Sequence, residues 1–337
     1  MIRIKYITRM VTGDGSAKPF RWGDCLFIAD AACTDYDWLL VYDEMPRSVG
    51  TISGEAEPLQ CPPERTILVT VEPPSIKIYP RLFTRQFGYV LTTHPERFLP
   101  HRHHRIGQGC LHWMAGYPMD KVLAMPEYPK SKLIATVCSS KQQKHTQHYR
   151  RYVLTKYLAE QLPEFDWFGR GVRALNRKYE ALNDYKYHVA VENYINDYHW
   201  TDKISDPILG LCLTFYAGDP KLGELLPPES FIPIPADNPP EALRIIREAI
   251  ANNEYEKRLP AIREARRLIV TKYNMYAQVV DLIHEHMAKP ESAQDAVVPG
   301  LKLYGRHRLR RRPLHALAEV VQLADYKLHA FFAPVKH

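Results

Sequence analysis

The stretch Tyr185-Lys-Tyr-His-Val-Ala-Val-Glu-Asn-Tyr-Ile-Asn-Asp-Tyr-His-Trp-Thr-Asp-Lys203 has the residue order of a parallel α/β unit. It joins an apolar run, Val189-Ala-Val191, to an acid–amide pair, Glu192-Asn193, and it ends in a typical helix start, Thr201-Asp-Lys203. In parallel sheets, polar groups at a strand's carboxyl end and the N-terminus of the next helix bind phosphates. The stretch therefore predicts a strand, a loop and a helix around a phosphate-bearing ligand.

Strand and helix patterns alternate on both sides of this stretch. The first half contains apolar or β-branched runs of strand length at residues 2–7, 38–42, 66–71 and 89–92. After a proline-dense segment at 118–129, a second series has strand patterns at 132–138, 187–191 and 213–216 and helical patterns at 148–162, 240–252 and 255–287. Two such series predict an α/β fold with two Rossmann-like, doubly wound domains facing a cleft. We expect an N-terminal domain at 1–125, a C-terminal domain at 126–300, and a basic run and helix at 301–337.

The composition is that of a globular protein. The chain has 337 residues, of which 45% are apolar, enough to fill two domains of ordinary size. No apolar run is long enough to span a bilayer, and the N-terminus lacks the apolar region of a signal peptide. The six cysteines are scattered without a Cys-x-x-Cys pair, which favours inert thiols in a reducing compartment. We therefore expect a cytoplasmic protein.

The formal net charge of +7 is unevenly distributed along the chain. The segment Arg306-His-Arg-Leu-Arg-Arg-Arg312 contains five arginines and no acid. Such a run is a solvated face, a nucleic-acid patch or a contact with anionic lipid headgroups. Because it lacks interleaved aromatic residues and a recognisable module, we expect no nucleic-acid partner. Peripheral contact with the inner membrane is the interpretation that we carry forward.

Several motifs together carry a family resemblance. The segment Lys186-Tyr-His-Val-Ala-Val-Glu-Asn193, with Trp200-Thr-Asp-Lys203, resembles the signature of glycosyltransferase family 10, the α-1,3/4-fucosyltransferases. Upstream, Cys138-Ser-Ser-Lys141, His148-Tyr-Arg-Arg151 and Phe168-Gly-Arg-Gly171 look like the bacterial branch of that family. The matched elements span residues 133–234 in the family's order and spacing.

The resemblance implies a GT-B fold, with the donor nucleotide in the C-terminal domain and the acceptor largely in the N-terminal one. It implies inverting transfer of L-fucose from GDP-fucose to a glycan hydroxyl, with no cofactor and no obligatory metal. A bacterial enzyme of this kind, without an N-terminal anchor, is expected to build surface lipopolysaccharide or capsule. The expected partners are thus a nucleotide sugar and a glycan acceptor.

An inverting transfer needs a base for the acceptor hydroxyl and positive charge for the leaving diphosphate. Lys203, in a first helical turn, and Arg151, which matches an arginine of the family, are the expected diphosphate contacts. The neighbouring Arg150 is expected to face solvent. The base is expected at Glu72, because Ile67-Leu-Val-Thr-Val-Glu72 resembles the family's strand that ends in the catalytic glutamate.

The complete set of expected donor-binding residues is Arg151, Glu192, Asn193, Tyr198, His199, Thr201, Asp202 and Lys203. Glu192 and Asn193 are predicted to contact the ligand as a pair, or to tie the loop to its neighbours. Asp202 replaces a glutamate of the family and is expected to accept from the ribose hydroxyls. His199 stands where the family has an aromatic ring, and Tyr198 is the alternative ring.

Two features left alternatives open. Asp206-Pro207 fits an N-cap followed by the first helical residue, so the helix is expected to begin either near Thr201 or at Asp206. The histidines at 94, 101, 103, 104 and 112 form a cluster whose spacing fits no established metal site. We interpret that cluster as a solvated loop on the acceptor side and expect no metal there.

Two other functions remain possible from the sequence. One keeps the fold and uses another nucleotide-activated deoxysugar, because His199 and Asp202 depart from the family pattern. The other is a non-catalytic module that binds a nucleotide or a glycan.

Overall fold

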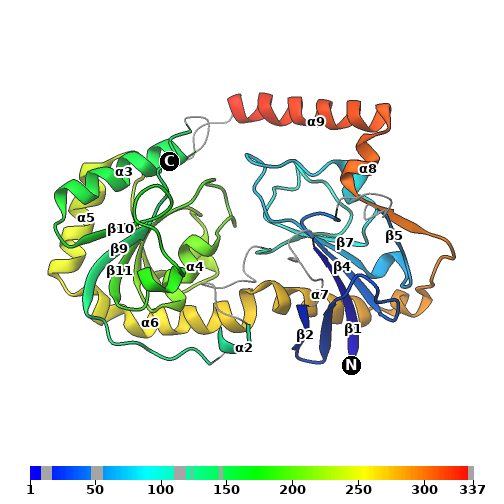
Figure 1. Ribbon diagram of the computed structural model, residues 1–337, viewed down its shortest axis with the longest axis horizontal. Helices are drawn as coiled ribbons and strands as arrows, with labels where there is room; N and C mark the ends of the chain where they lie inside the picture. Colours follow the sequence, from blue (N-terminus) through cyan, green and yellow to red (C-terminus); the bar gives the residue numbers. More distant parts are fainter. Residues whose placement is uncertain (9–16, 47–55, 110–118, 123, 144–146, 333–337) are drawn as a thin grey trace. The chain divides into compact units, whose positions relative to one another are not determined.

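The computed structural model describes the chain except for residues 9–16, 47–55, 110–118, 123, 144–146 and 333–337 (Figure 1). It divides into two compact units. Unit 1 comprises Met1–Gly109 and Met275–Pro334, and unit 2 is formed mainly by Cys110–Asn274. Each unit is built on one mostly parallel sheet, so the predicted fold class of two Rossmann-like α/β units is confirmed.

The sheet of unit 1 has the order β2-β3-β1-β4-β6-β7-β8, and within it only the β2–β3 pair is antiparallel. Its strands are β1 (Ile2–Thr8), β2 (Ala17–Trp22), β3 (Cys25–Ala29), β4 (Trp38–Tyr42), β6 (Thr66–Val69), β7 (Tyr89–Thr92) and β8 (His104–Ile106). All five residues of β4 are buried, as expected for a central strand covered on both faces. A separate antiparallel pair joins β5 (Ala56–Pro58) to β14 (Lys302–Tyr304).

The helical elements of unit 1 come mostly from the end of the chain. They are η1 (Pro63–Arg65), α1 (Arg81–Thr84), α7 (Met275–Met287), η7 (Pro290–Gln294), α8 (Arg306–Arg310) and α9 (Pro313–Phe332). Within the described parts of the chain, we find no helix with the length and apolar content needed to cross a membrane.

The expected domain boundaries at 125/126 and 300/301 differ from those of the two units. The physical reason is α7, which was expected to continue a helix of the second domain. Its buried residues Val279 and Ile283 instead share one core cluster with Ile4 and Trp38 of the unit 1 sheet. The helical pattern at 255–287 is broken by a π-helical turn, η6 (Ile269–Tyr273), and the chain leaves unit 2 directly after it.

The sheet of unit 2 is entirely parallel, with the order β10-β9-β11-β12-β13. Its strands are β9 (Lys132–Val137), β10 (Phe165–Phe168), β11 (Tyr185–Val191), β12 (Leu213–Ala217) and β13 (Phe231–Pro233). This is a doubly wound order in which the direction of winding changes between β9 and β11. Ligands of such sheets bind beside this switch point, at the carboxyl ends of the strands.

The helical elements of unit 2 are α2 (Met119–Val122), α3 (His148–Gln161), η3 (Lys178–Ala181), α4 (Asp202–Leu209), η4 (Leu222–Glu224), η5 (Pro228–Ser230), α5 (Pro239–Ala251), α6 (Glu254–Leu268) and η6. Thr201 is the N-cap of α4, and its side chain accepts from the Lys203 N–H at 3.2 Å. Of the two expected helix starts, the one at Asp206 is therefore wrong. Asp206 lies inside the helix and forms an ion pair with Lys178.

Candidate functional site

The switch point of unit 2 brings together residues from two strand ends and one helix. Asn193 follows β11, Ser139 follows β9, and Arg151 lies in the first turn of α3. Arg151 Nη1 donates to Asn193 Oδ1 at 2.8 Å, and Nη2 lies 3.5 Å from Ser139 Oγ. Arg151 is only 8% exposed, and its Nε has no hydrogen-bond partner among the described residues. A rigid guanidinium with spare donor capacity thus lies where a phosphate would bind.

Lys203 provides a second positive charge near the same place. Its Nζ lies 3.1 Å from Thr201 Oγ1, 3.4 Å from Glu192 Oε2 and 3.8 Å from Asp202 Oδ1. Desolvation opposes the charge of Lys203, but the carboxylates of Glu192 and Asp202 outweigh it and raise the pKa of Lys203. The charges of Arg151 and Lys203 lie close enough to repel each other. An anion between them would remove this repulsion.

The carboxylate of Glu192 contacts both Thr201 and Lys203. It is fully buried, and it accepts from the Thr201 N–H at 2.9 Å and from the Thr201 hydroxyl at 2.8 and 2.9 Å. The Tyr216 hydroxyl donates to it at 3.4 Å. Glu192 has no exposed atom to offer a ligand, so its position fits the tying role, while Asn193 is half-buried at the strand end.

Asp202 has a partner that the sequence did not suggest. Its Oδ2 accepts from Lys178 Nζ at 2.7 Å, and the same ammonium lies 2.6 Å from Asp206 Oδ2. Burial lowers the pKa of Lys178, but Asp202 and Asp206 outweigh this and raise it above its ordinary value. The Asp202 side chain is half-exposed, so the same carboxylate would have to serve both Lys178 and any ribose hydroxyl.

The two expected aromatic positions have different surroundings. His199 is 2% exposed, and its ring packs edge-on against Tyr194 with centroids 5.2 Å apart, so it offers no open face for stacking. Tyr198 is half-buried and has a left-handed backbone, with φ of 60°. Its N–H donates to Asp219 at 2.9 Å, and its hydroxyl donates to Glu224 at 2.9 Å. Of the two rings, Tyr198 is the more exposed.

Asp219 fixes this loop to the end of β12. It is 3% exposed, and its Oδ1 accepts from the N–H groups of Tyr198 and Lys221, each at 2.9 Å. Burial raises the pKa of Asp219 to about 6, although both backbone hydrogen bonds favour its charged form. Its Oδ2 has no hydrogen-bond partner among the described residues. Asp219 was not among the expected site residues, because an aspartate after a buried strand is a common turn residue.

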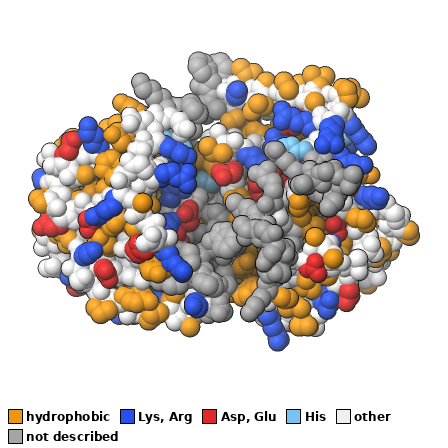
Figure 2. All heavy atoms as spheres, viewed as in Figure 1, with side chains coloured by type: hydrophobic (Ala, Val, Ile, Leu, Met, Phe, Trp, Pro, Cys, Tyr) orange, Lys and Arg blue, Asp and Glu red, His pale blue; other side chains and the backbone are white. Residues whose placement is uncertain are grey.

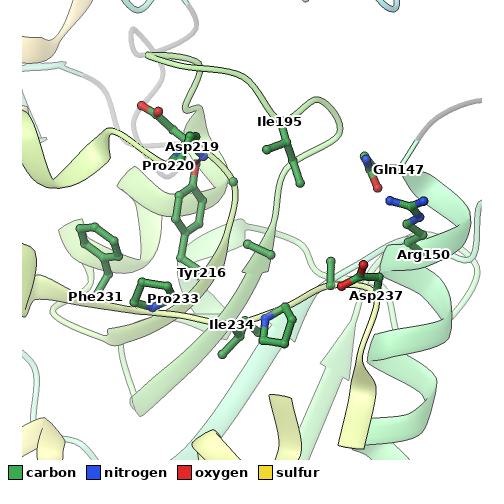
Figure 3. A pocket seen from close by; sticks show the side chains of 14 residues that line it. Gln147, Arg150, Ile195, Tyr216, Asp219, Pro220, Phe231, Pro233, Ile234 and Asp237 are labelled. Atoms are coloured by element: carbon green, nitrogen blue, oxygen red, sulfur yellow. Dashed lines mark hydrogen bonds between the residues drawn. The ribbon is translucent and has the colours of Figure 1, made fainter. Parts of the chain in front are cut away.

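A cavity of about 300 Å³ lies at the carboxyl ends of β12 and β13 (Figure 3). Its apolar part includes Tyr216 and Phe231, with prolines and isoleucines beside them. Gln147, Arg150 and Asp237 gather on one side of the cavity (Figure 3). Arg150 was expected to face solvent, but it lines this cavity. Asp237 was missed, because in the sequence it resembles part of the capping segment before α5, where Asn238 is the N-cap.

In unit 1, Glu72 follows β6 on a loop whose backbone is held by buried polar groups. The side chain of Glu72 is exposed. Its carbonyl accepts from His94 Nε2 at 2.8 Å, and the preceding N–H, that of Val71, donates to the Tyr79 hydroxyl at 3.1 Å. The Tyr79 hydroxyl donates in turn to Asp43 in a short hydrogen bond. Burial lowers the pKa of His94 to about 4, so the ring is neutral and keeps its Nε2 proton for this bond at ordinary pH.

The other described histidines of the expected cluster also bind backbone carbonyls. The bonds are His101 to Phe87 at 3.0 Å, His103 to Gly88 at 2.9 Å and His104 to His94 at 3.0 Å. The interpretation as a solvated loop is wrong for His94, which is buried, whereas His101, His103 and His104 are half-buried. His112 lies outside the described residues. Among the described residues, Asp24, Cys25 and His284 have side-chain ligand atoms close enough together to hold a metal ion, and none of the expected site residues belongs to that group.

The basic run 306–312 is divided by the fold. Arg306 is 18% exposed on its side chain, and it forms ion pairs with Glu44 at 3.2 Å and Glu319 at 2.5 Å. It is therefore not part of a surface patch, contrary to the expectation for the whole run. The remaining arginines are exposed, at positions 308, 310, 311 and 312.

Comparisons with known proteins give structural likeness without sequence relatives. No protein-family model matches the chain, and no curated protein matches it. A crystal structure of an α1,3-fucosyltransferase is similar at 14% identity and a TM-score of 0.46, over 82% of this chain and 91% of that one. An α1,3-fucosyltransferase structure with GDP-fucose is similar at 14% identity and a TM-score of 0.44, over 77% and 81%. A sucrose-phosphate synthase from Thermosynechococcus elongatus is similar at 9% identity and a TM-score of 0.42, over 84% and 88%.

Proposed function

We propose that the chain is an inverting glycosyltransferase of the fucosyltransferase type, which transfers L-fucose from GDP-fucose to a glycan hydroxyl. One observation supports this best. Arg151, Asn193 and Lys203 belong to motifs that resemble glycosyltransferase family 10, and the fold gathers them at the switch point of a parallel sheet. The proposed setting is the synthesis of a bacterial surface polysaccharide or lipopolysaccharide.

In this proposal the diphosphate of the donor is held by unit 2. Arg151 offers a planar set of donors to phosphate oxygens, and Lys203 adds a point charge at the start of α4. Because Asn193 Oδ1 accepts from Arg151, its amide group remains as a donor to a phosphate or sugar oxygen. Glu192 and Thr201 keep Lys203 in position.

The cavity at β12 and β13 is the proposed nucleobase site. Guanine presents two neighbouring donors, N1–H and the N2 amino group, which suit the carboxylate of Asp237. It also presents the acceptors O6 and N7, which suit the guanidinium of Arg150. Tyr216 and Phe231 supply apolar surface for the ring. Adenine would place the lone pair of its N1 against Asp237, so this pair of side chains favours a guanine nucleotide.

In the proposed reaction, residues of this chain take up the proton of the acceptor and stabilise the negative charge of the leaving group. Glu72 takes the proton of the acceptor hydroxyl, and the acceptor oxygen forms a bond to the anomeric carbon of fucose. The bond from that carbon to the β-phosphate oxygen breaks, and GDP leaves with the electron pair. Arg151 and Lys203 stabilise the negative charge that develops on the diphosphate. Attack from the opposite face inverts the anomeric centre.

Nucleotide binding tests the donor class first. Thermal unfolding with GDP, ADP, UDP, CDP and guanosine should show the largest rise in Tm with GDP. Transfer to a panel of glycans should then require GDP-fucose and persist in excess EDTA. The substitution Glu72→Gln should abolish transfer with little change in GDP binding. Turnover with another nucleotide-activated deoxysugar and none with GDP-fucose would favour that alternative donor. GDP binding without transfer to any glycan would favour a binding module, and no selectivity for GDP would contradict the proposal.

A further inference from the structure

Three side chains with metal-ligating atoms meet beside the start of β3 in unit 1. Asp24 lies in the two-residue turn between β2 and β3, Cys25 is the first residue of β3, and His284 lies on α7. The Asp24 Oδ1 atom lies 3.0 Å from His284 Nε2 and 3.7 Å from Cys25 Sγ. All three ligand atoms lie within 4.8 Å of one another. A carboxylate, a thiol and an imidazole therefore converge from positions up to 260 residues apart in the chain.

These separations suit a zinc ion. Zinc bonds are about 2.3 Å long to sulfur and about 2.0 to 2.2 Å long to nitrogen or oxygen, so neighbouring ligand atoms of a tetrahedral site lie about 3.4 to 3.6 Å apart. The measured separations of 3.0 and 3.7 Å lie on either side of this range. Calcium and magnesium prefer oxygen ligands to a thiolate or an imidazole. The ligand set therefore favours Zn²⁺, with the fourth coordination position taken by water.

The fold holds the ligands in place from one side and leaves them open on the other. Cys25 is fully buried and belongs to the same core cluster as Ile283, the residue before His284. Gly23, with φ of 58°, permits the tight turn that places Asp24 beside Cys25. The side chains of Asp24 and His284 are 55% and 50% exposed, so an ion can reach them from solvent.

Two simpler explanations account for less of this arrangement. Figure 2 shows acidic side chains dispersed over the face that it draws, so an exposed carboxylate alone is ordinary on this surface. Asp325 and His329 form a similar pair on α9, 3.4 Å apart, but among the described residues only the Asp24 pair has a thiol within metal-ligand distance. Burial and the Asp24 carboxylate raise the pKa of the Cys25 thiol to about 12, so it is not a reactive nucleophile at ordinary pH.

We propose that Asp24, Cys25 and His284 bind one zinc ion that links α7 to β3. The thiol gives up its proton to solvent as its sulfur binds the ion. Because the chain re-enters unit 1 at the start of α7, the ion joins the returning helix to the N-terminal part of the sheet. Cys25 lies at the amino end of the parallel strands, whereas Glu72 follows β6 at their carboxyl end. The ion therefore stabilises unit 1 and takes no part in the proposed transfer.

Metal titration of the full chain tests the proposal. The chain is treated with a chelator, and Co²⁺ or Zn²⁺ is then added back. Cys25→Ala removes the sulfur, and His284→Gln removes the imidazole at an exposed position that leaves the core intact. Cys61→Ala is the matched control for a buried cysteine of unit 1, being 1% exposed, and His329→Gln is the control for a histidine beside an aspartate.

The wild type should bind one equivalent of Co²⁺ with a thiolate-to-cobalt charge-transfer band, and Zn²⁺ should abolish the band and raise Tm. Cys25→Ala should lose the band. His284→Gln should bind zinc at least about 100-fold more weakly, since loss of an outer-shell partner alone costs roughly 10- to 100-fold. Both controls should bind as the wild type does, and excess EDTA should lower Tm without changing the response to GDP.

Three results would each overturn the proposal. The first is a wild type with no thiolate band and no rise in Tm with zinc. The second is a band that persists in Cys25→Ala, and the third is an unchanged zinc affinity in His284→Gln.

Discussion

Arg151→Met should weaken GDP binding and leave guanosine binding unchanged. The guanidinium is 8% exposed, and beyond the bond from Nη1 to Asn193 and the 3.5 Å contact of Nη2 with Ser139, each terminal nitrogen keeps a second N–H. It can therefore give at least one charge-assisted hydrogen bond to the diphosphate. Such a bond contributes about 1.5 to 3 kcal/mol, which corresponds to roughly 10- to 150-fold in Kd. Methionine keeps much of the side-chain length and fills the same space without the charge.

Calorimetric titration of GDP, GMP and guanosine into the variant and the wild type is the assay. The matched control is Arg150→Met, the adjacent residue on α3, which lines the nucleobase cavity. It should weaken guanosine and GDP by the same factor, whereas Arg151→Met should affect only ligands with phosphates. Thermal unfolding without ligand checks that both variants fold. Equal losses for guanosine and GDP in Arg151→Met, or no loss for either, would refute the assignment of the diphosphate to Arg151.

Three further predictions concern the other described residues. Asp237→Asn should reduce the preference for GDP over ADP at least tenfold in competition binding. The reason is that the asparagine amide has one oxygen acceptor, whereas the carboxylate can accept from both N1–H and the N2 amino group of guanine. An unchanged ratio of the two affinities would show that Asp237 does not recognise the base. His94→Ala should lower kcat for transfer roughly 10- to 100-fold, with the Kd for GDP unchanged, because it releases the backbone carbonyl of the Glu72 loop. His94→Gln can still donate a hydrogen bond and should recover part of kcat. A fall in Tm with unchanged kcat would assign His94 a purely structural role. The pKa of Asp219 is raised from 3.8 to about 6, so the folded state binds the extra proton in this range and Asp219 costs stability as pH rises through it. Asp219→Asn should therefore gain up to about 3 kcal/mol over the wild type between pH 4 and pH 7, measured by urea unfolding; a difference that does not change with pH would contradict this.

Local sequence patterns located the elements of unit 2 well. Strand β11 was expected because Val189-Ala-Val191 is apolar and β-branched, and it runs from Tyr185 to Val191. Thr201 was one of two expected helix starts, and it caps α4 through its own hydroxyl. These features depend on side chains and backbone groups a few residues apart, so the sequence contains the interactions that decide them.

Features that depend on distant residues were not predictable in the same way. The helix α7 was assigned to the wrong unit, because its apolar face would suit either sheet and only packing with residues such as Ile4 decides between them. The partner of Asp202 is Lys178, 24 residues earlier in the chain. Four histidines that formed an apparent cluster in the sequence hold backbone carbonyls instead, because burial requires those carbonyls to be paired.

Residues 185–203 alone were enough to predict an α/β chain with a polar strand end and a capped helix. The sequence also determined which residue types could bind a phosphate there, since those types are fixed by the amino acids. The tertiary structure decided their roles. Folding buried Glu192 next to Lys203 and brought Asn193 into hydrogen-bonding contact with Arg151. It also placed Arg150 in the lining of a cavity. The physical reason is that the pairing and burial of a side chain depend on neighbours brought close only by folding.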